Sequence, residues 1–597
     1  MMFKLAPPAP PTRDALAAVG ALVISYHVAS AALSLLRGRS LTELVVGGAV
    51  AAARALPLAS AALDAGLDSA LDGLRDELAP VSAESLLALP RAGRRASAVA
   101  AELRAALAHD AARNGLARGT AFGGIYHALG GGGAAPPLHA LHADVSAAFL
   151  DTNQLYPGLF STARRVEAEA VAMAVALLRD GCGGEGGGGG GGGARAPAAC
   201  GLFTSGGTES VILAVKAHRD AALAALGFVG GALPPLVAAA RAGRVLNVVA
   251  GATAHPALDK ACALLGLRLK KVPVGAPDFA LAPAAARAAL DADTVLLFAS
   301  APGFAHGVVD DVPALGAAAA AFAGSPFGRA GVPLHVDNCL GGLLLSFTPG
   351  APPFDFRASP AVASVSMDLH KFAGAPKGAS VVAFRDPARR RMAYSATADY
   401  PGGLYATPTL AGSRSGAAGA LAWATLVATG ADGLARAAAR VARVHAALAR
   451  GVAAIPHLAL LGRPAACVVA FAPAPGARFS IFALAARMAA LRGWRLALLQ
   501  APAGAHVVVT ERFDEPWEGG AGGGEGAGGG EGDGALTVGE AWLRDLAACA
   551  AAAQAQPADP RFEGQGEAAI YGAAGVLPRG EVGEILRRYC DVLTVVR

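Results

Sequence analysis

The stretch SMDLHKFAGAPKG, residues 366–378, decides how this chain of 597 residues folds and which chemistry it can carry. It contains Lys371 and Lys377, two of only seven lysines in the sequence, and it passes from a short apolar run into a loop rich in Gly and Pro. A lysine that is partly withdrawn from water can have a lowered pKa and can form a Schiff base with an aldehyde. The alternative is a pair of solvated surface lysines, so other segments must support a reactive amine here.

A second segment, TSGGTES at residues 204–210, has the features of a phosphate cradle. Gly206 and Gly207, next to Ser205, allow the backbone to approach a ligand closely. Thr208 can cap the helix that is predicted to follow, and the free N–H groups of that helix attract an anion. The segment is not a P-loop, because it lacks G-K-[ST], and it is not a G-x-G-x-x-G fingerprint. A plain helix cap is the alternative interpretation.

Asp337 ends the apolar run PLHVD, residues 333–337, and is the third candidate. Ligands of open α/β sheets bind at the carboxyl ends of the strands, and a carboxylate there can pair with a protonated pyridine nitrogen. A turn or capping aspartate is the alternative. A phosphate cradle, a strand-end aspartate and a lysine 34 residues later together predict a pyridoxal 5'-phosphate site. In this interpretation His255 stacks on the pyridine ring and His370 holds the cofactor phosphate.

The segments between these motifs alternate between predicted strands and helices, which indicates an α/β fold with a buried, mostly parallel sheet and helices on both faces. Predicted strands are residues 244–250, 294–300, 333–337, 362–366 and 379–384, and predicted helices include 256–265 and 310–322. We expect a large cofactor-binding domain at 119–425. A long helix from about 425 to 451 leads into a smaller α+β domain, 426–597, with strands near 467–471 and 506–510.

The N-terminal region predicts a single membrane anchor, residues 1–40. Residues 15–36 carry no formal charge, and a helix of this length spans a bilayer core of about 30 Å. A cleaved targeting peptide is the alternative, because Ala29-Ser30-Ala31 resembles a cleavage site. Residues 41–118 are predicted to form an amphipathic helical neck, and the Gly-rich inserts 181–195 and 519–534 are predicted surface loops.

Composition excludes some classes of protein. Hydrophobic residues make up 54% of the chain and charged residues 16%, which excludes a wholly disordered protein. The formal net charge is +5 with no run of five like charges, so we expect no nucleic-acid partner. The seven cysteines are widely scattered without metal-ligand spacing, which favours a reducing compartment and predicts no metal site.

From about residue 119 onward the sequence resembles the sphingosine-1-phosphate lyases, a branch of the group II pyridoxal phosphate decarboxylase family. The matching stretches are TSGGTES (204–210), TAHPALDKACALLGLRLKKVPV (253–274), SAPGFAHGVVDDV (300–312), PLHVDNCLGG (333–342), HKFAGAPKGAS (370–380), PGGLYATPTLAGSRSG (401–416) and AAIYGAAGVLP (568–578). The resemblance implies a fold-type I transferase-like large domain. It also implies a carbon-carbon lyase of sphingolipid degradation, which cleaves a phosphorylated long-chain base to a fatty aldehyde and phosphoethanolamine. The N-terminal span is similar to that of the lyases, which implies a single-pass protein of the endoplasmic reticulum membrane with a cytosolic catalytic part.

The same resemblance implies roles for individual residues. Lys371 holds the cofactor covalently, and Asp337 keeps the pyridine nitrogen protonated while the C2–C3 bond breaks in a retro-aldol step. The base that removes the 3-hydroxyl proton is left open between Lys371 and a tyrosine such as Tyr126. The residues implied around the substrate phosphate are Tyr126, Asn153, Tyr156 and Lys377. Ser413 and Arg414 belong to a loop that enters the neighbouring subunit's site, so a homodimer with shared active sites is expected.

One motif departs from the family pattern N-P-L-H-P, because this chain reads Asn153-Gln154-Leu155-Tyr156-Pro157. Tyr156 can donate a hydrogen bond but cannot carry the positive charge that a histidine could place beside a phosphate. The loss of one charge-assisted hydrogen bond would weaken phosphate binding by about 1.5–3 kcal/mol. SRSG in place of S-R-P-G is a smaller change.

Two other functions compete with the lyase. An amino acid decarboxylase of the same fold would use the same cofactor residues but needs no membrane anchor. A membrane-anchored inactive homologue or scaffold would bind no cofactor. The stretch PGGLYATPTLAGSRSG, residues 401–416, and the N-terminal span both favour the lyase.

Overall fold

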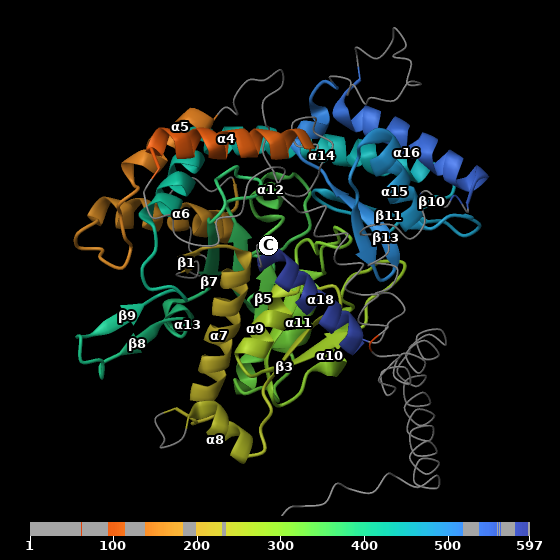
Figure 1. Ribbon diagram of the computed structural model, residues 1–597. Coiled ribbons are helices and arrows are strands. Elements are labelled where there is room, and N and C mark those ends of the chain that lie inside the picture. Colours follow the sequence, from red (N-terminus) through yellow and green to blue (C-terminus); the bar gives the residue numbers. More distant parts are fainter. Residues whose placement is uncertain are drawn as a thin grey trace, which may run out of the picture.

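A mostly parallel sheet of seven strands forms the centre of the molecule (Figure 1). The structure is a computed structural model that describes residues 61, 94–113, 138–182, 199–229, 234–517, 536–557, 559, 562 and 579–594. In spatial order the strands are β1 (Cys200–Thr204), β7 (Ser380–Phe384), β6 (Val362–Asp368), β5 (Leu334–Asp337), β4 (Thr294–Ser300), β2 (Asn247–Gly251) and β3 (Arg268–Val272). Strands β3, β2, β4, β5 and β6 pair in parallel, whereas β7 is antiparallel to β6 and to β1. The predicted α/β class and its mostly parallel sheet are confirmed.

Helices cover both faces of this sheet, which explains why its inner strands are continuously apolar. Strands β2 and β4 are buried at every position. Consecutive residues of β2 belong to different cores. Val248 belongs to a cluster with residues of α7 (Gly207–Ala225) and α9 (Ala257–Leu264), whereas Val249 belongs to a cluster that contains Ala286 of α10 (Pro283–Ala289), the helix that contacts β2. Helix α6 (Ser161–Asp180) packs on β1 and β7 at the other end of the sheet. The other helices around the sheet are α4 (Ala96–Arg113), α5 (His139–Ala148), α8 (Pro235–Arg241), α11 (Val312–Ala320), η1 (Gly328–Ala330), α12 (Gly342–Phe347), α13 (Pro387–Arg391) and α18 (Arg579–Thr594).

A second, smaller sheet follows the large one in the chain. It has four antiparallel strands in the order β10 (Leu458–Leu460), β11 (Val468–Pro473), β13 (Ala503–Val508) and β12 (Ala497–Gln500), with helices α15 (Ile481–Arg492) and α16 (Val538–Ala555) and the turn η2 (Glu511–Asp514). Trp494 and Trp542 are fully buried there, and the indole of Trp494 donates a hydrogen bond to Asp545 at 2.8 Å. This confirms the smaller α+β part of the prediction.

The long helix that joins the two parts, α14, spans Gly416–Ala454 (Figure 1). It begins earlier than predicted because the side chain of Ser415 accepts a hydrogen bond from the N–H of Ala417 and caps the helix. Gly430 interrupts it with φ 63°, a left-handed conformation that favours glycine. The expected boundary at residue 425 therefore falls inside a helix. Before α14, strands β8 (Ser395–Thr397) and β9 (Tyr405–Thr407) form a hairpin that projects from the body at the lower left of Figure 1.

The five predicted strands of the large sheet are all present, and two further strands, β1 and β3, were missed. Both lie at the edges of the sheet. The residues of β3, RLKKV, are mostly polar, because one side of an edge strand remains accessible to water. The mostly polar sequence of β3 therefore gave no apolar run, and β1, CGLFT, is buried but has only the short apolar pair Leu202-Phe203.

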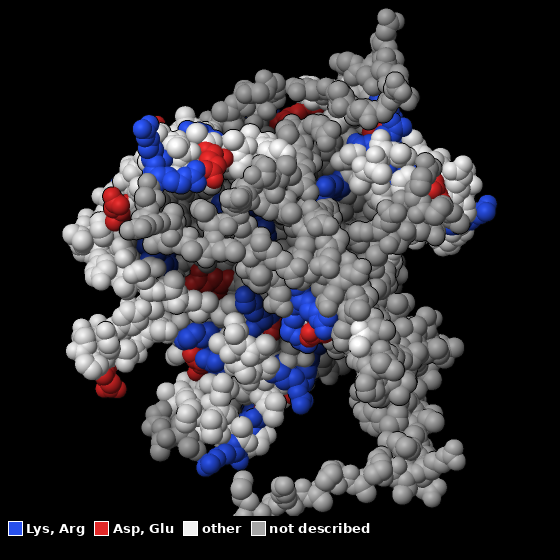
Figure 2. Space-filling view, in the orientation of Figure 1, with Lys and Arg blue, Asp and Glu red and all other residues white. Residues whose placement is uncertain are grey.

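Among the described helices, none is both long and apolar enough to span a membrane. The anchor predicted for residues 1–40 lies outside the described residues, as do most of the neck and nearly all of both Gly-rich inserts. Figure 2 shows basic and acidic side chains interspersed over the described part of one face. Two of the ion pairs on the large sheet are Lys270–Asp291 at 2.5 Å and Lys271–Asp259 at 2.6 Å.

Candidate active site

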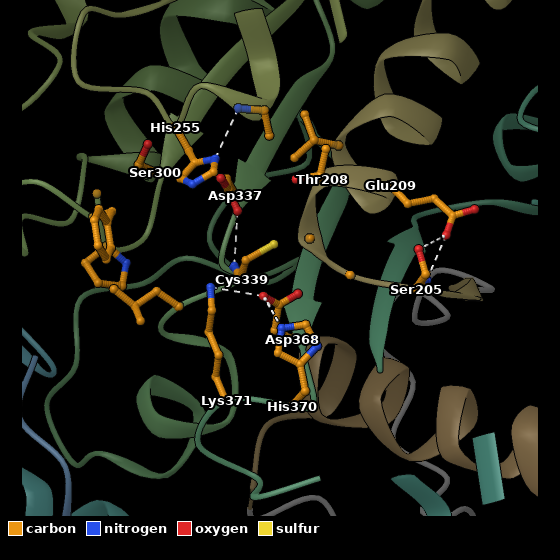
Figure 3. A pocket seen from close by; sticks show the side chains of 18 residues that line it. Ser205, Thr208, Glu209, His255, Ser300, Asp337, Cys339, Asp368, His370 and Lys371 are labelled. Carbon is orange, nitrogen blue, oxygen red and sulfur yellow. Dashed lines mark hydrogen bonds and ion pairs between the residues drawn. The ribbon is translucent and has the colours of Figure 1, made fainter. Parts of the chain in front are cut away.

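A cavity of about 500 Å³ lies where the carboxyl ends of β4, β5 and β6 meet the first turn of α7 (Figure 3). The sheet brings residues to this cavity that are far apart in the chain. Eight of the residues predicted from the sequence line it, namely Ser205, Gly206, Gly207, Thr208, His255, Asp337, His370 and Lys371. Three further polar residues that line it, Glu209, Ser300 and Asp368, were not identified from the sequence.

The first turn of α7 borders the cavity with backbone N–H groups. The helix begins at Gly207, and Gly206 is its N-cap without a side-chain hydrogen bond. The prediction that Thr208 caps the helix is therefore wrong, because Thr208 lies inside the first turn. The first N–H groups of a helix have no partner within the helix, so this end of α7 suits an anion such as a phosphate.

Glu209 holds Ser205, the residue of the cradle that stands just before the N-cap Gly206. The backbone N–H and the hydroxyl of Ser205 both donate hydrogen bonds to Oε2 of Glu209, each at 2.7 Å. The other oxygen, Oε1, accepts a hydrogen bond from the N–H of Leu410 at 2.9 Å. Glu209 is buried, and it ties the start of α7 to the segment 401–416.

Asp337, the last residue of β5, has one oxygen that is already engaged. Its Oδ1 accepts hydrogen bonds from the hydroxyl of Ser366 at 3.0 Å and from the N–H of Cys339 at 3.1 Å. These two contacts fix the orientation of the carboxylate and leave Oδ2 as the atom that can face a pyridine nitrogen. Burial, together with the nearby charges of Asp337 and Asp368, raises the pKa of the Cys339 thiol well above its usual value, so this thiol stays protonated.

Lys371 is paired with a buried carboxylate three residues earlier in the chain. Its Nζ lies 3.0 Å from Oδ2 of Asp368, and Nε2 of His370 lies 3.4 Å from the same oxygen (Figure 3). Burial alone would raise the pKa of Asp368, but the hydrogen bond from His370 and the charge of Lys371 outweigh burial and lower this pKa to about 2. Asp368 could have been suspected from the sequence, because it ends an apolar run just before Lys371.

His255 lies on the wall opposite the lysine and is held by its own loop. Its Nδ1 accepts a hydrogen bond from the N–H of Ala257 at 3.1 Å. The neighbouring wall residue Phe304 packs edge-on against His506, with ring centres 4.7 Å apart. Since His506 belongs to β13, the small sheet supports one wall of the cavity.

Five of the predicted residues do not line this cavity, namely Asn153, Tyr156, Lys377, Ser413 and Arg414. Asn153 donates a hydrogen bond to Ser413 at 3.1 Å and accepts one from the N–H of Arg414 at 3.3 Å. Arg414 forms two hydrogen bonds of 2.9 Å with Glu167. Tyr156 lies close to this second cluster in the chain, and its side chain is exposed.

Lys377 also lies outside the lining of the cavity. Its Nζ donates a hydrogen bond to the backbone oxygen of His370 at 3.4 Å. Burial and the charge of Lys371 lower its pKa. Tyr126, the remaining predicted residue, lies outside the described residues.

Comparison with known proteins agrees with this geometry. A family described as "Pyridoxal-dependent decarboxylase conserved domain" matches residues 192–473. A sphingosine-1-phosphate lyase of Oryza sativa is 31% identical over 95% of this chain and 92% of its own length, and one of Drosophila melanogaster is 31% identical over 76% and 72%. The structure of a sphingosine-1-phosphate lyase of Burkholderia pseudomallei is 29% identical, with a TM-score of 0.66 over 86% of this chain and 98% of its own.

The fold and the cavity thus define a pyridoxal phosphate-dependent lyase of the decarboxylase-like class. Within that class, the chain belongs to the sphingosine-1-phosphate lyase family. The residues present are suited to the cofactor. Lys371 offers an amine for its aldehyde, Asp337 offers a carboxylate for its ring nitrogen, and the first turn of α7 offers N–H groups for its phosphate.

Gly207 provides a direct test of the close approach between α7 and the sheet. A Cβ at this position would lie 2.7 Å from Sγ of Cys339 and 3.1 Å from Oδ1 of Asp368. We expect Gly207→Ala to lower the free energy of unfolding by about 1–3 kcal/mol, because one of these buried atoms must move. Urea unfolding of the full chain measures the change.

Gly206→Ala is the matched control for this substitution. The nearest atom to a Cβ at Gly206 is Cε1 of His370 at 3.7 Å, an ordinary contact, and the φ of 163° is extended backbone. We expect a change within about 0.5 kcal/mol. Equal losses in the two variants would contradict the close packing at Gly207.

Proposed function

We propose that this lyase cleaves a phosphorylated long-chain base, such as sphingosine 1-phosphate, between C2 and C3. The products are a fatty aldehyde and phosphoethanolamine. The observation that carries the proposal is that Lys371 and Asp337 line one cavity in a chain of the sphingosine-1-phosphate lyase family. The names of the relatives supply the substrate class, and the cavity supplies residues for the chemistry.

Three residues of the cavity would hold the cofactor's reactive parts. Lys371 would bind the cofactor aldehyde and release it to the substrate amine. The bound cofactor supplies an electron-withdrawing ring that takes up the electron pair left at C2. Asp337, held by Ser366 and Cys339, would keep the ring nitrogen protonated. His255 would cover one face of the ring.

The proton balance of the cleavage sets two further requirements. The 3-hydroxyl group loses its proton to a base as C3 becomes the aldehyde carbon, and C2 must gain a proton before phosphoethanolamine leaves. Lys371 and Tyr126 remain the two candidates for this base. His370 lies beside the first turn of α7, where it can assist the N–H groups in holding the cofactor phosphate.

The second cluster supports a homodimer with shared active sites. Asn153, Ser413 and Arg414 lie together but away from the Lys371 cavity of their own chain. We infer that this cluster, with Tyr156, completes the site of a second copy and contacts the phosphate of its substrate. Lys377 and Tyr126 are proposed to contact the same phosphate.

The activity test uses the purified full chain with a long-chain base phosphate and added pyridoxal phosphate. We expect a fatty aldehyde and phosphoethanolamine in equal amounts. Lys371→Ala should lose the yellow absorbance of the bound cofactor, and Asp337→Ala should fold normally but lose turnover by roughly two orders of magnitude or more. Lys260→Ala, which changes an exposed lysine, should retain both properties.

Two outcomes of that assay would overturn the proposal. Release of carbon dioxide from a free amino acid, with no aldehyde from the lipid, would identify a decarboxylase of the same fold. A colourless wild-type protein that never binds pyridoxal phosphate would identify an inactive homologue.

Mixing of subunits tests the shared site. We expect coexpressed Lys371→Ala and Arg414→Ala chains to regain about a quarter of wild-type activity, because half of the dimers are mixed and each mixed dimer has one intact site. Lys371→Ala mixed with Asp337→Ala is the matched control and should stay inactive, because both changes fall in the same half of the site. Absence of recovery in the first mixture, with both chains folded, would contradict the shared site.

We also propose that residues 1–40 anchor the protein in the endoplasmic reticulum membrane as a single pass, with the catalytic part in the cytosol. The support is the uncharged stretch 15–36. The full chain should sediment with membranes and resist extraction by carbonate, whereas a chain lacking residues 1–40 should not. Equal behaviour of the two chains, or a mature N-terminus that begins after residue 31, would contradict a retained anchor.

A further inference from the structure

Asp368 lies at the junction of the cofactor lysine, the neighbouring histidine and the start of α7. It is the last residue of β6, and only 3% of its surface is exposed. One of its oxygens, Oδ2, lies 3.0 Å from Nζ of Lys371 and 3.4 Å from Nε2 of His370. In Figure 3 the side chain of Lys371 extends toward the cavity with its amine beside this carboxylate.

The backbone around Asp368 leaves its carboxylate little freedom. Strand β7 pairs with β6 as far as Asp368, which stands opposite Ser380. Oδ1 is buried without a hydrogen-bond partner among the described residues, and it lies 3.1 Å from the place where a Cβ of Gly207 would stand. The amine of Lys371 therefore lies beside a buried anion whose backbone is held by the sheet.

The other titratable groups near this pair come from several elements. Asp337 ends β5 and Cys339 follows it, Lys377 lies in the loop after Lys371, and Glu209 and His255 line the cavity from α7 and from the loop before α9. The buried thiol of Cys467, just before β11, is also within reach of the charge of Lys371, but burial raises its pKa and keeps it neutral. Glu209 is engaged by Ser205 and Leu410, and the thiol of Cys339 stays protonated. Asp368 lines the cavity, and its carboxylate lies within hydrogen-bonding distance of Nζ of Lys371.

We propose that Asp368 is the positioning residue of Lys371, which holds the amine in the cavity in its protonated form and so sets the pH at which the lysine captures the cofactor. This inference rests on the assignment of Lys371 as the cofactor lysine. Capture requires that the ammonium first gives a proton to solvent. The free electron pair then adds to the aldehyde carbon, a C=N bond forms, and the aldehyde oxygen leaves as water.

The direction of the effect follows from electrostatics. An anion within about 4–6 Å favours the charged form of a neighbouring group, which commonly shifts its titration by one to three pH units. The carboxylate stays ionised throughout the neutral and alkaline range, because the pKa of Asp368 is about 2. A change of Asp368 that removes the charge but retains an oxygen acceptor for His370 therefore isolates the electrostatic part of the interaction.

The first experiment measures how fast the cofactor-free full chain turns yellow after addition of pyridoxal phosphate, as a function of pH. We expect Asp368→Asn to move the midpoint of this pH profile downward by about one to three pH units relative to wild type. Asp220→Asn is the matched control, because Asp220 also pairs with a lysine, Lys216 at 2.9 Å, but lies near the far end of α7. The control should keep the wild-type midpoint. An unchanged midpoint in Asp368→Asn would overturn the proposal.

A second measurement needs no cofactor. An amine-reactive reagent is added in limiting amount to the cofactor-free protein at pH 7, and labelling of Lys371 is compared with that of the exposed Lys260 by mass spectrometry. The ratio should rise about tenfold or more in Asp368→Asn, in line with a shift of at least one pH unit. A changed ratio in a protein that never turns yellow would refute the cofactor assignment and retain the role of Asp368. An unchanged ratio in a protein that does turn yellow would refute the role of Asp368 alone.

Asp368→Glu keeps the test decisive if Asp368→Asn does not fold. This variant retains the charge but moves it by one methylene group. We expect a midpoint near that of wild type and a smaller fraction of protein that captures the cofactor, because the amine is displaced. A midpoint lowered as far as that predicted for Asp368→Asn would show that the charge is not responsible.

Discussion

Parallel pairing of β4, β5 and β6 is the constraint on which the site depends. The register sets Ser300 opposite Asp337, and Asp337 opposite Ser366. All three strands therefore end at one edge of the sheet, and Asp368 at the end of β6 reaches the same edge. Because both faces of the sheet are covered by helices, this edge is where polar side chains can meet a ligand without disturbing the core.

The charged groups of the site are each held by a polar partner. Ser366 holds Asp337, Ser205 and Leu410 hold Glu209, and Asp368 pairs with Lys371. A buried carboxylate is costly unless it is paired and hydrogen-bonded, so these partners are what allow three acidic side chains to lie around one cavity. The same contacts limit how far each group can move when the cofactor and the substrate bind.

The small sheet and the segment 401–416 connect this edge to the rest of the molecule. His506 of the small sheet packs against Phe304 in the cavity wall, and Leu410 binds Glu209 beside the cradle. The cluster of Asn153, Ser413 and Arg414 at the end of that segment is held together by the bidentate pair of Arg414 with Glu167. The residues that line the cavity all lie between 205 and 371, and the small sheet and the segment 401–416 support them from behind.

Residue type and local pattern were sufficient to predict the central sheet, the cradle TSGG, Asp337, His255 and Lys371, because continuously apolar strands and strand-end polar residues are visible one segment at a time. They were not sufficient for the edge strands β1 and β3: β3 is mostly polar, and the apolar part of β1 is only two residues long, Leu202-Phe203, before the cradle begins. Only the tertiary structure identified Asp368, Glu209 and Ser366 as residues that support the site. It also excluded Thr208 as a helix cap. Finally, it showed that Asn153, Ser413 and Lys377 do not line this cavity. The physical reason is that which residues support or line the cavity depends on distances between elements far apart in the chain. Those distances are set by how the strands pair and the helices pack, which no single segment of sequence reveals.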